Sequence, residues 1–401
     1  MKTVVIGAGV VGSATAYALS LEGHDVVLLD RAKEAGTVTS LANGAQLSYS
    51  FVEPLASPST LRALPAMLAN PNSPLRFKLR ADPRQWSWGL QFLRACNSGQ
   101  VSDGTHNLLR LAGLSRMTLE SWMKSEHLEF EFQRSGKLVL CPDEKALTRQ
   151  AEQVRLQKWA GVEQEVLDRS GCLEREPALA RYPDFVGGIW TQSECAGNPF
   201  LYCQALIRAG KVRGLDFLPY TEVLGLEQKG GAAQIVHTSS GPIYADAFVI
   251  AGGINSPALA KMVGEQVPIY PIKGYSVTLD MTSGSLQPRT NVTDLSQKMV
   301  LAPLNGRLRV AAMAEVVGFE LNIPQDRIRQ ILAGVQAVYP DVCTSIQTNA
   351  WAGLRPATPT SEPIIRRTKI SNVILNVGHG SLGFTLAAGS AAAVASLLRS
   401  E

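Results

Sequence analysis

The sequence has few charged residues, few histidines and no regular spacing of its cysteines, and each of these absences excludes a class of protein. Charged residues make up 18% of the 401 positions, and 38 basic against 34 acidic side chains leave a net charge of +4, too small for a dedicated nucleic-acid-binding protein. The five histidines fall at no metal-ligand spacing, so no metal site is predicted. The six cysteines form no CxxC pair, which indicates buried thiols in a reducing compartment. Hydrophobic residues make up 45%, which excludes global disorder.

A targeting segment is also missing from the sequence. Met1 leads almost at once into a β-branched run, Thr3 to Ile6, without the basic region, apolar core and cleavage site of a signal peptide. Residues 370–398 carry no Asp, Glu, Lys or Arg, but glycines and asparagines interrupt them. We interpret this stretch as a strand, a glycine-rich turn and a helix, and not as a membrane span. A soluble or peripheral protein is therefore expected.

The first thirty residues form the clearest local pattern. A buried strand ends in Gly7-x-Gly9-x-x-Gly12, a helix runs to Leu21, and a second strand ends at Asp30. Gly7 permits the tight turn, Gly9 lets a pyrophosphate approach the backbone, and Gly12 lets the helix pack on the strand. The helix N-terminus then offers its N–H groups to phosphate, and Asp30 is placed to accept from a ribose hydroxyl. The pattern predicts a dinucleotide site. The alternatives are that Gly7 to Gly12 form a glycine turn by chance and that Asp30 is only a surface acid at the end of a strand.

Two further features favour FAD over a nicotinamide cofactor. Residues 247–250 form a second strand that ends in small residues, Ala251 and Gly252. Residues 378–383 form another glycine-rich turn, which opens the last helix. A second helix N-terminus suits a second negatively polarised group, such as the flavin N1–C2=O edge on reduction.

The predicted elements suggest an α/β protein with a discontinuous cofactor domain. Helices are expected near 103–125, 143–160 and 324–338, and strands dominate 214–250 and 267–315. Because the nucleotide-type motifs lie at both ends and in the middle, we expect a Rossmann-like domain plus an α+β substrate domain built on an antiparallel sheet. The predicted FAD-binding domain comprises 1–80, 145–175, 200–262 and 340–401. The predicted substrate domain comprises 81–144, 176–199 and 263–339.

Several blocks of sequence carry a resemblance to a known family. VVIGAGVVGSATAYAL, SLANGAQLS, PIKGYSVTL, WAGLRPATP and NVGHGSLGFTLAAG follow one another in order along nearly the whole chain. They resemble the D-amino-acid dehydrogenases, within the D-amino-acid oxidase-like FAD-dependent oxidoreductases. The resemblance implies a non-covalent FAD and oxidation of an amino acid at Cα.

The same resemblance implies roles for particular residues. The glycine turn, with Val10, Val11, Asp30 and Arg31, would hold the ADP half of FAD. A second group would line the phosphates, the ring and the ribityl chain: Ser40, Asn43, Gly44, Ala45, Gln46, Val223, Ala251, Gly252, Gly380, Ser381, Leu382, Gly383 and Phe384.

Three residues are candidates for the substrate site. Arg355 matches the arginine that fixes the substrate carboxylate in this class, and its planar fork suits that task; the alternative is an interface salt bridge. Tyr275 follows Lys273-Gly274 and would face the substrate, or pack within the strand. His379 would contact flavin or substrate, or be held by backbone hydrogen bonds in its turn. Glu315 matches a family block but receives no role.

The sequence also departs from the family pattern near the expected pocket. Pro359-Thr360-Ser361-Glu362-Pro363 stands where a Pro-Asp-Gly turn is usual, and Ala311-Ala312 stands where Gly-Gly usually precedes methionine. These departures put the identity of the substrate in doubt, but not the flavin chemistry.

Residues 60–96 combine six basic residues with a single acid, Asp82, and with Trp86 and Trp88. Such a surface suits an anionic membrane, and membrane-associated members of the family pass electrons to quinones. The alternative is a helical flap over the cofactor with its arginines in water. The protein is therefore expected in the cytoplasm, free or on the cytoplasmic face of the inner membrane.

The predicted reaction is hydride transfer from Cα of a D-amino acid to flavin N5, which gives an imino acid and then a keto acid. Rival predictions are a dehydrogenase or oxidase for D-proline, hydroxyproline, glycine or sarcosine, a nicotinamide-linked enzyme, and an FAD-holding subunit of a larger complex. No side chain has to act as a strong base, because the cofactor carries the chemistry.

Overall fold

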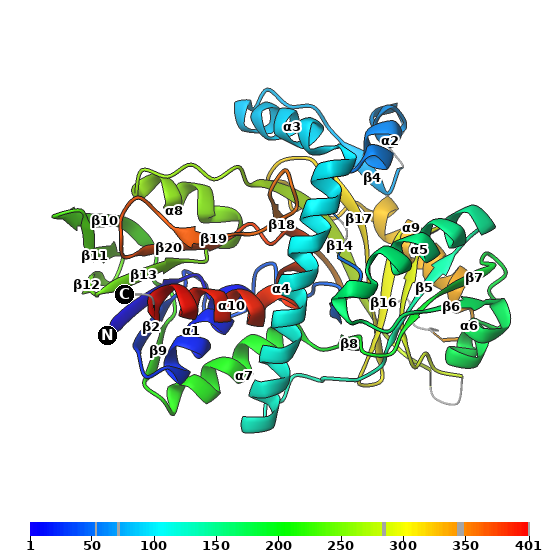
Figure 1. Cartoon of the computed structure of the whole chain (residues 1–401), viewed down its shortest axis with the longest axis horizontal. Helices are drawn as coiled ribbons and strands as arrows, with labels where there is room; N and C mark the ends of the chain where they lie inside the picture. The colour runs from blue at the N-terminus through cyan, green and yellow to red at the C-terminus, as the bar shows by residue number, and fades with distance from the viewer. Residues whose placement is uncertain (53, 70–72, 283–285, 343–348, 400–401) are drawn as a thin grey trace.

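The N-terminal glycine pattern forms the centre of a six-stranded sheet. The computed structural model describes residues 1–52, 54–69, 73–282, 286–342 and 349–399, and its overall arrangement is shown in Figure 1. The sheet order is β19-β20-β13-β1-β2-β9, and every pair is parallel except β19–β20. The strands are β1 (Lys2–Ile6), β2 (Asp25–Leu29), β9 (Leu215–Leu218), β13 (Ala247–Ile250), β19 (Ile364–Arg367) and β20 (Val373–Val377).

Helices and a small sheet cover the two faces of this sheet. One face packs on α1, α7, α10 and α4 around a core that includes Tyr17, Trp122 and Phe384. The other face packs on α8 and on the three-stranded sheet β10-β11-β12. The elements are α1 (Val10–Leu21), α4 (Ser98–Ser125), α7 (Pro199–Lys211), α8 (Ser256–Met262), α10 (Gly383–Arg399), β10 (Val223–Lys229), β11 (Ala232–Thr238) and β12 (Gly241–Tyr244).

The last helix is a core element of this layer. Residues 380–399 are long and apolar enough to cross a membrane by length and composition, but 61% of the most apolar window is buried. The helix packs against α1 and α4, and α4 runs across the junction between the two halves of the molecule (Figure 1). Ser115 of α4 donates a hydrogen bond to the carbonyl of Thr385 at 2.6 Å. The contact with α4 is close because Gly389 has no Cβ; a Cβ there would lie 2.6 Å from the carbonyl of Leu111.

A second, nine-stranded sheet forms the other half. Its order is β18-β14-β17-β16-β15-β5-β7-β6, with β4 beside β17. Most pairs are antiparallel, as predicted, but β15–β5 and β17–β4 are parallel. The strands are β4 (Leu75–Phe77), β5 (Lys137–Cys141), β6 (Glu165–Asp168), β7 (Gly187–Thr191), β14 (Tyr270–Asp280), β15 (Asn291–Asp294), β16 (Met299–Leu304), β17 (Arg307–Val316) and β18 (Asn349–Ala357).

The remaining elements connect or cover these sheets. The helix α9 packs on β14 and β17, and its apolar side chains share a core with Val277, Leu279 and Val310. A short pair, β3–β8, links the loop after β2 to the segment before α7. The elements are α2 (Pro58–Ala69), α3 (Pro83–Ala95), α5 (Glu144–Leu156), α6 (Arg169–Arg175), α9 (Gln325–Val338), β3 (Gln46–Leu47), β8 (Cys195–Ala196) and the short 3-10 helices at 158–160, 177–179, 253–255 and 380–382.

The α/β architecture with a second, mostly antiparallel sheet matches the predicted fold class, but four segments differ from the predicted domain boundaries. The strands β4, β6 and β18 lie within segments assigned to the FAD-binding domain, yet they pair in the nine-stranded sheet. The helix α4 lies within a segment assigned to the substrate domain, yet it packs on α10. Tertiary contacts decide these memberships: β4 pairs with β17 and β18 pairs with β14, both far away in the sequence, and β6 joins the sheet through its neighbour β7. Cys343 lies outside the described residues; the other five cysteines are buried free thiols.

Candidate functional site

A large cavity lies where the two sheets meet. Its volume is about 1160 Å³, above the range of about 300–1,000 Å³ that is common for small-ligand pockets. The predicted site residues line it with one exception, Gly12. Those in the wall are Gly7, Gly9, Val10, Val11, Asp30, Arg31, Ser40, Asn43, Gly44, Ala45, Gln46, Val223, Ala251, Gly252, Tyr275, Arg355, His379, Gly380, Ser381, Leu382, Gly383 and Phe384.

The glycine turn shapes one end of this cavity. Gly7 has a φ of +106°, and a Cβ there would lie 2.6 Å from the carbonyl oxygen of Ala251. A Cβ on Gly12 would lie 1.7 Å from the carbonyl oxygen of Gly7, which explains why Gly12 serves helix packing and does not reach the wall. The hydroxyl of Ser40 accepts a hydrogen bond from the N–H of Val10 at 3.1 Å. The backbone N–H groups at the start of α1 therefore border a space that a pyrophosphate could occupy.

Asp30 has a structural task that the sequence pattern did not reveal. Its carboxylate accepts hydrogen bonds from the N–H groups of Ala8, at 2.7 Å, and Ala32, at 2.8 Å. These bonds fasten the glycine turn to the end of β2. The carboxylate still borders the cavity, and each oxygen has a second lone pair, so its predicted contact with a ribose stays a prediction.

The loop after β2 runs across the face of the nine-stranded sheet. Ser276 donates to the carbonyl of Ala42 at 2.6 Å, and Arg309 donates to the carbonyl of Asn43 at 3.1 Å. Gln46 donates to carbonyl oxygens on β15 and β16. Burial lowers the pKa of Arg309 to about 10. Arg309 thus fixes one wall of the cavity, and the sequence analysis missed it because only the pairing of distant strands brings it to the loop.

The second glycine-rich turn places a neutral histidine in the wall. His379 is 4% exposed, and burial lowers its pKa to about 3. Its backbone forms a bridge with Ala357, whereas its Nε2 atom has no hydrogen-bond partner among the described residues. Both predicted alternatives thus have support: the backbone is held, and one ring nitrogen remains available to a ligand.

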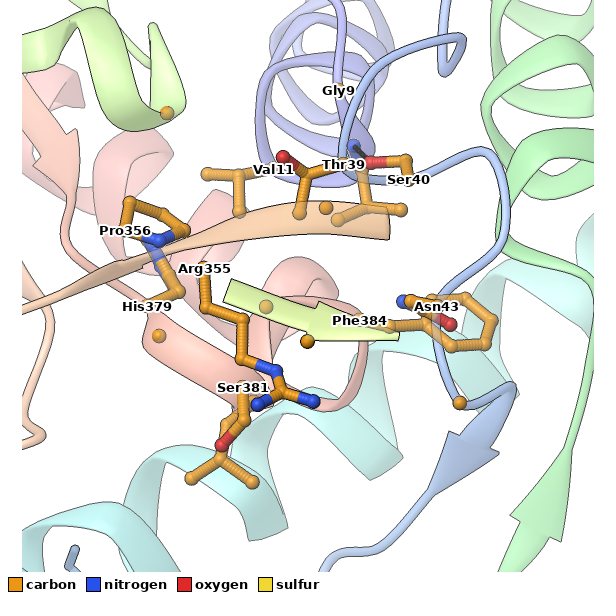
Figure 2. Close-up of a pocket in the computed structure, with 18 of the residues that line it drawn as sticks. Gly9, Val11, Thr39, Ser40, Asn43, Arg355, Pro356, His379, Ser381 and Phe384 are labelled. Atoms are coloured by element: carbon orange, nitrogen blue, oxygen red, sulfur yellow. Dashed lines mark hydrogen bonds between the residues drawn. The ribbon is translucent and has the colours of Figure 1, made fainter. Parts of the chain in front are cut away.

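Arg355 extends into the cavity from β18 (Figure 2). Its Nη1 donates to the carbonyl of Met313 at 2.9 Å, and its guanidinium lies directly over Gly274. Burial lowers the pKa of Arg355 to about 10, and within the described ranges no acidic side chain pairs with it. A buried cation without a counter-ion is costly, so this geometry favours a carboxylate ligand over the interface salt bridge.

A bulge in β17 sets the carbonyl that holds Arg355. Lys273 pairs with Glu315 and Tyr275 with Ala312, so β17 carries one extra residue at this point. Met313 has a φ of +68° there, a conformation that costs a residue other than glycine about 1–3 kcal/mol. The surrounding pairs hold this strained backbone, and its carbonyl faces the guanidinium.

Tyr275 points away from Arg355. Its ring belongs to the core on the α9 face of the sheet, and it is 1% exposed. The hydroxyl donates to Glu315 at 2.8 Å, and the other oxygen of Glu315 lies 2.6 Å from Arg327. Burial raises the pKa of Tyr275 far above its usual range. This geometry favours the packing interpretation of Tyr275 and gives Glu315 a structural task.

The residues of the wall fit a flavin dinucleotide. The wall combines the tight Gly7 turn, two helix N-termini and an unbonded nitrogen on His379. Within the described part of the chain, no cluster of three or more His, Cys, Asp or Glu side chains could hold a metal ion.

Comparison with known proteins gives consistent matches. The family model described as FAD dependent oxidoreductase (DAO) matches residues 2–397. D-amino acid dehydrogenase 2 from Pseudomonas aeruginosa is 40% identical over 97% of this chain and 92% of its own length. D-amino acid dehydrogenase from Dechloromonas aromatica is 36% identical over 99% and 97%. The structure of glycine oxidase from Bacillus cereus superposes with a TM-score of 0.76 at 20% identity, covering 100% of this chain and 95% of that one. The structure of L-proline dehydrogenase from P. horikoshii superposes with a TM-score of 0.74 at 19% identity, covering 100% and 93%.

Proposed function

The chain belongs to the DAO family of FAD-dependent oxidoreductases, and from this premise we propose that it oxidises a D-amino acid at Cα. It is an FAD enzyme of amino-acid oxidative deamination. The D configuration is supported by relatives at 34–40% identity that are named D-amino acid dehydrogenase. The solved glycine oxidase and L-proline dehydrogenase structures lie below 25% identity, so they speak for the fold alone.

The single observation that carries the proposal is the guanidinium of Arg355, which is half-buried in the cavity wall and has no acidic partner among the described residues. Met313 occupies Nη1 from one side, which leaves the remaining donors for two charge-assisted hydrogen bonds to a carboxylate. A carboxylate fixed in this way holds Cα at one position, and positioning of this kind can supply about 7–11 kcal/mol. The bound FAD supplies the hydride acceptor.

The other residues shape the site and take no part as acids or bases. His379 is neutral over the working pH range because burial lowers its pKa to about 3. It can accept or donate one hydrogen bond at Nε2, but it cannot act as a charged acid. The substrate ammonium must lose its proton before oxidation, because hydride transfer from Cα needs the nitrogen lone pair to form the C=N bond. The imino acid product then takes up water to give a keto acid and ammonia.

An anaerobic titration tests this function. The holoenzyme is mixed with matched D- and L-amino acids, glycine and proline analogues, and loss of the visible flavin absorbance is followed. We expect rapid bleaching with D-amino acids. A yellow protein that only an L-amino acid bleaches would refute the stereochemical proposal.

Arg355→Ala tests the anchor itself. Losing two charge-assisted hydrogen bonds of about 1.5–3 kcal/mol each should raise KM on the order of a hundredfold or more and lower kcat, while the FAD spectrum stays unchanged. Arg355→Lys should recover part of the loss because it keeps the charge. Normal turnover by Arg355→Ala would contradict the anchor.

We further propose a quinone acceptor reached at an anionic membrane surface. On α3, Trp86 and Leu90 are 55% and 52% exposed, and Leu93 continues the same side. Arg62 and Arg94 are exposed nearby, whereas Lys78, Arg80 and Arg84 pair with acids. Figure 1 shows α2 and α3 projecting together from one edge of the molecule. Residues 70–72 of this segment lie outside the described residues.

The cavity supports this proposal because its wall extends to the base of α2. Ser57, Thr60 and Leu75 all border it. An acceptor dissolved in a bilayer would thus meet the cavity beside the surface that contacts lipid. The alternative is a flap whose basic residues stay in water.

Co-sedimentation with phosphatidylglycerol and phosphatidylcholine vesicles tests the membrane contact. We expect binding to the anionic vesicles, weakened by salt and by Leu90→Gln. Leu156→Gln is the matched control, because Leu156 is 70% exposed on α5. Equal binding by the two variants would contradict the role of α3.

A further inference from the structure

A buried lysine, Lys137 on β5, borders the cavity and has no part in the site described so far. It is 3% exposed, and its Nζ donates a 2.7 Å hydrogen bond to the hydroxyl of Ser48. The ammonium also lies 4.6 Å from the centre of the Phe51 ring. An ammonium has three donors, and no other acceptor for them occurs among the described residues.

The position of Lys137 follows from two segments that converge on it. Ser48 lies two residues after Gln46, the last of the loop residues that are predicted to line the phosphates and one edge of the flavin ring. Thr385 directly follows residues 380–384, which are predicted to lie under the flavin C2=O edge. The N–H of Ser48 donates to the hydroxyl of Thr385 at 3.1 Å. Lys137 therefore reaches the point where both flavin-facing segments meet.

The carboxylate of Glu194 favours the charged form of Lys137 but forms no ion pair with it in the described chain. Glu194, which is 1% exposed, accepts hydrogen bonds from the N–H groups of Tyr49 and Ser50 and from the Ser50 hydroxyl. It lies too far from Lys137 for an ion pair, since none occurs between them in the described chain, but its field still acts on the ammonium. Burial lowers the pKa of Lys137 to about 8, and the carboxylate of Glu194 opposes that shift.

We propose that Lys137 supplies positive charge to the pyrimidine edge of the bound FAD and stabilises the negative charge that the ring gains on reduction. It adds to the helix N-terminus of α10, which faces the same edge. The proposal rests on FAD binding in this cavity and is independent of which amino acid is oxidised.

The competing explanation is purely structural: Lys137 would only balance the charge of Glu194 and fasten the segment 48–50. In that case, removing the charge would lower stability but leave the properties of the bound flavin unchanged. A readout on the flavin itself therefore separates the two explanations.

Sulfite binding provides that readout without any amino acid. Sulfite adds to flavin N5 and leaves the ring anionic, so its affinity reports the positive charge near the pyrimidine edge. Lys137→Gln can keep the hydrogen bond to Ser48 and Lys137→Met cannot, but both remove the charge. We expect both to weaken sulfite binding on the order of tenfold or more, as for a unit charge several ångströms away at an effective dielectric constant of about 20, and to lower the flavin midpoint potential.

Two variants serve as controls. Lys137→Arg keeps the charge and should bind sulfite as the unchanged protein does. Lys145→Gln removes an exposed lysine of α5 outside the cavity wall and should have no effect. Unchanged sulfite affinity and potential in both neutral variants would overturn the proposal. Failure of amino acids to bleach the flavin, with sulfite behaving as expected, would overturn the proposed substrate alone.

A pH series covers the case in which neither neutral variant folds. Relative to Lys137→Arg, the unchanged protein should lose sulfite affinity as the pH rises through about 8. Burial raises the pKa of Glu194, that of Cys195 to about 11 and that of Tyr49 well above its usual value. Because these three groups are present in both proteins, the difference between the two pH profiles reports Lys137. Identical pH profiles for the two proteins would overturn the proposal.

Discussion

The substitution Gly274→Ala tests the placement of Arg355 directly. A Cβ on Gly274 would lie 2.3 Å from Nη2 and 2.6 Å from Cζ of Arg355, whereas ordinary van der Waals contacts lie near 3.5–4.0 Å. The guanidinium must therefore move by about 1 Å or more. A displacement of about 1 Å can lower the rate on the order of a hundredfold, so kcat/KM should fall by roughly that factor.

The assay compares steady-state kinetics with binding of a carboxylic acid that lacks the amino group, followed by the flavin spectrum. In Gly274→Ala, kcat/KM and the affinity for the carboxylic acid should both fall, while FAD stays bound. Gly113→Ala is the matched control, because Gly113 lies within α4 and a Cβ there meets nothing within 4 Å; it should be neutral or stabilising. If Gly274→Ala retained normal kcat/KM and normal affinity for the carboxylic acid, the position of Arg355 over Gly274 would not matter for substrate binding.

Three further predictions concern stability and loading. Gly7→Ala places a side chain at φ +106° and 2.6 Å from a carbonyl oxygen. It should lower the free energy of unfolding by at least about 1–3 kcal/mol, which chemical denaturation measures. It should also abolish FAD retention, which visible absorbance measures. Glu315→Gln removes one charge of the buried pair between Glu315 and Arg327 and should lower stability by about 3–5 kcal/mol. Glu315→Leu combined with Arg327→Met should recover much of this loss, and equal melting of the two variants would contradict the buried pair. Burial lowers the pKa of His379 to about 3, so the unfolded chain binds a proton first as the pH falls. Its effect on stability is absent above about pH 6.5 and reaches a loss of about 2 kcal/mol by pH 5; His379→Gln should remove that loss in thermal melts, and an unchanged pH dependence would exclude the neutral histidine.

Local sequence patterns predicted most helices, strands and glycine turns. Contacts between distant segments place the remaining residues of the site, and local patterns do not encode those contacts. The glycine turn, Asp30 and the turn at 378–383 are each encoded within about thirty residues, and the structure brings all of them to one cavity. Lys137 reaches that cavity on β5, whose partner β15 lies far along the chain. Arg309 supports the cavity wall through its hydrogen bond to Asn43, which is also far away in the sequence, so no local signal marks either residue.

Tyr275 illustrates a second limit. In a strand buried on both faces, polar and apolar residues do not alternate between a wet face and a dry face, so the sequence gives no sign of the direction of a side chain. The segment Tyr270–Asp280 is such a strand, because nearly all of its residues are buried. The hydrogen bond between Tyr275 and Glu315 shows the direction, and only the register with β17 provides it.

The strand order of the six-stranded sheet also constrains when the protein can acquire its cofactor during synthesis. The central strand β1 pairs with β13, which follows some 240 residues later, and β13 pairs with β20 near residue 375. The cavity wall likewise runs from Ile6 to Thr385. Until a ribosome has synthesised the last helix, the apolar face of α1 that receives it stays exposed to solvent or to chaperones. The cavity wall is therefore completed only after α10 has been synthesised, and we expect truncation before α10 to leave a chain that neither binds flavin nor stays soluble.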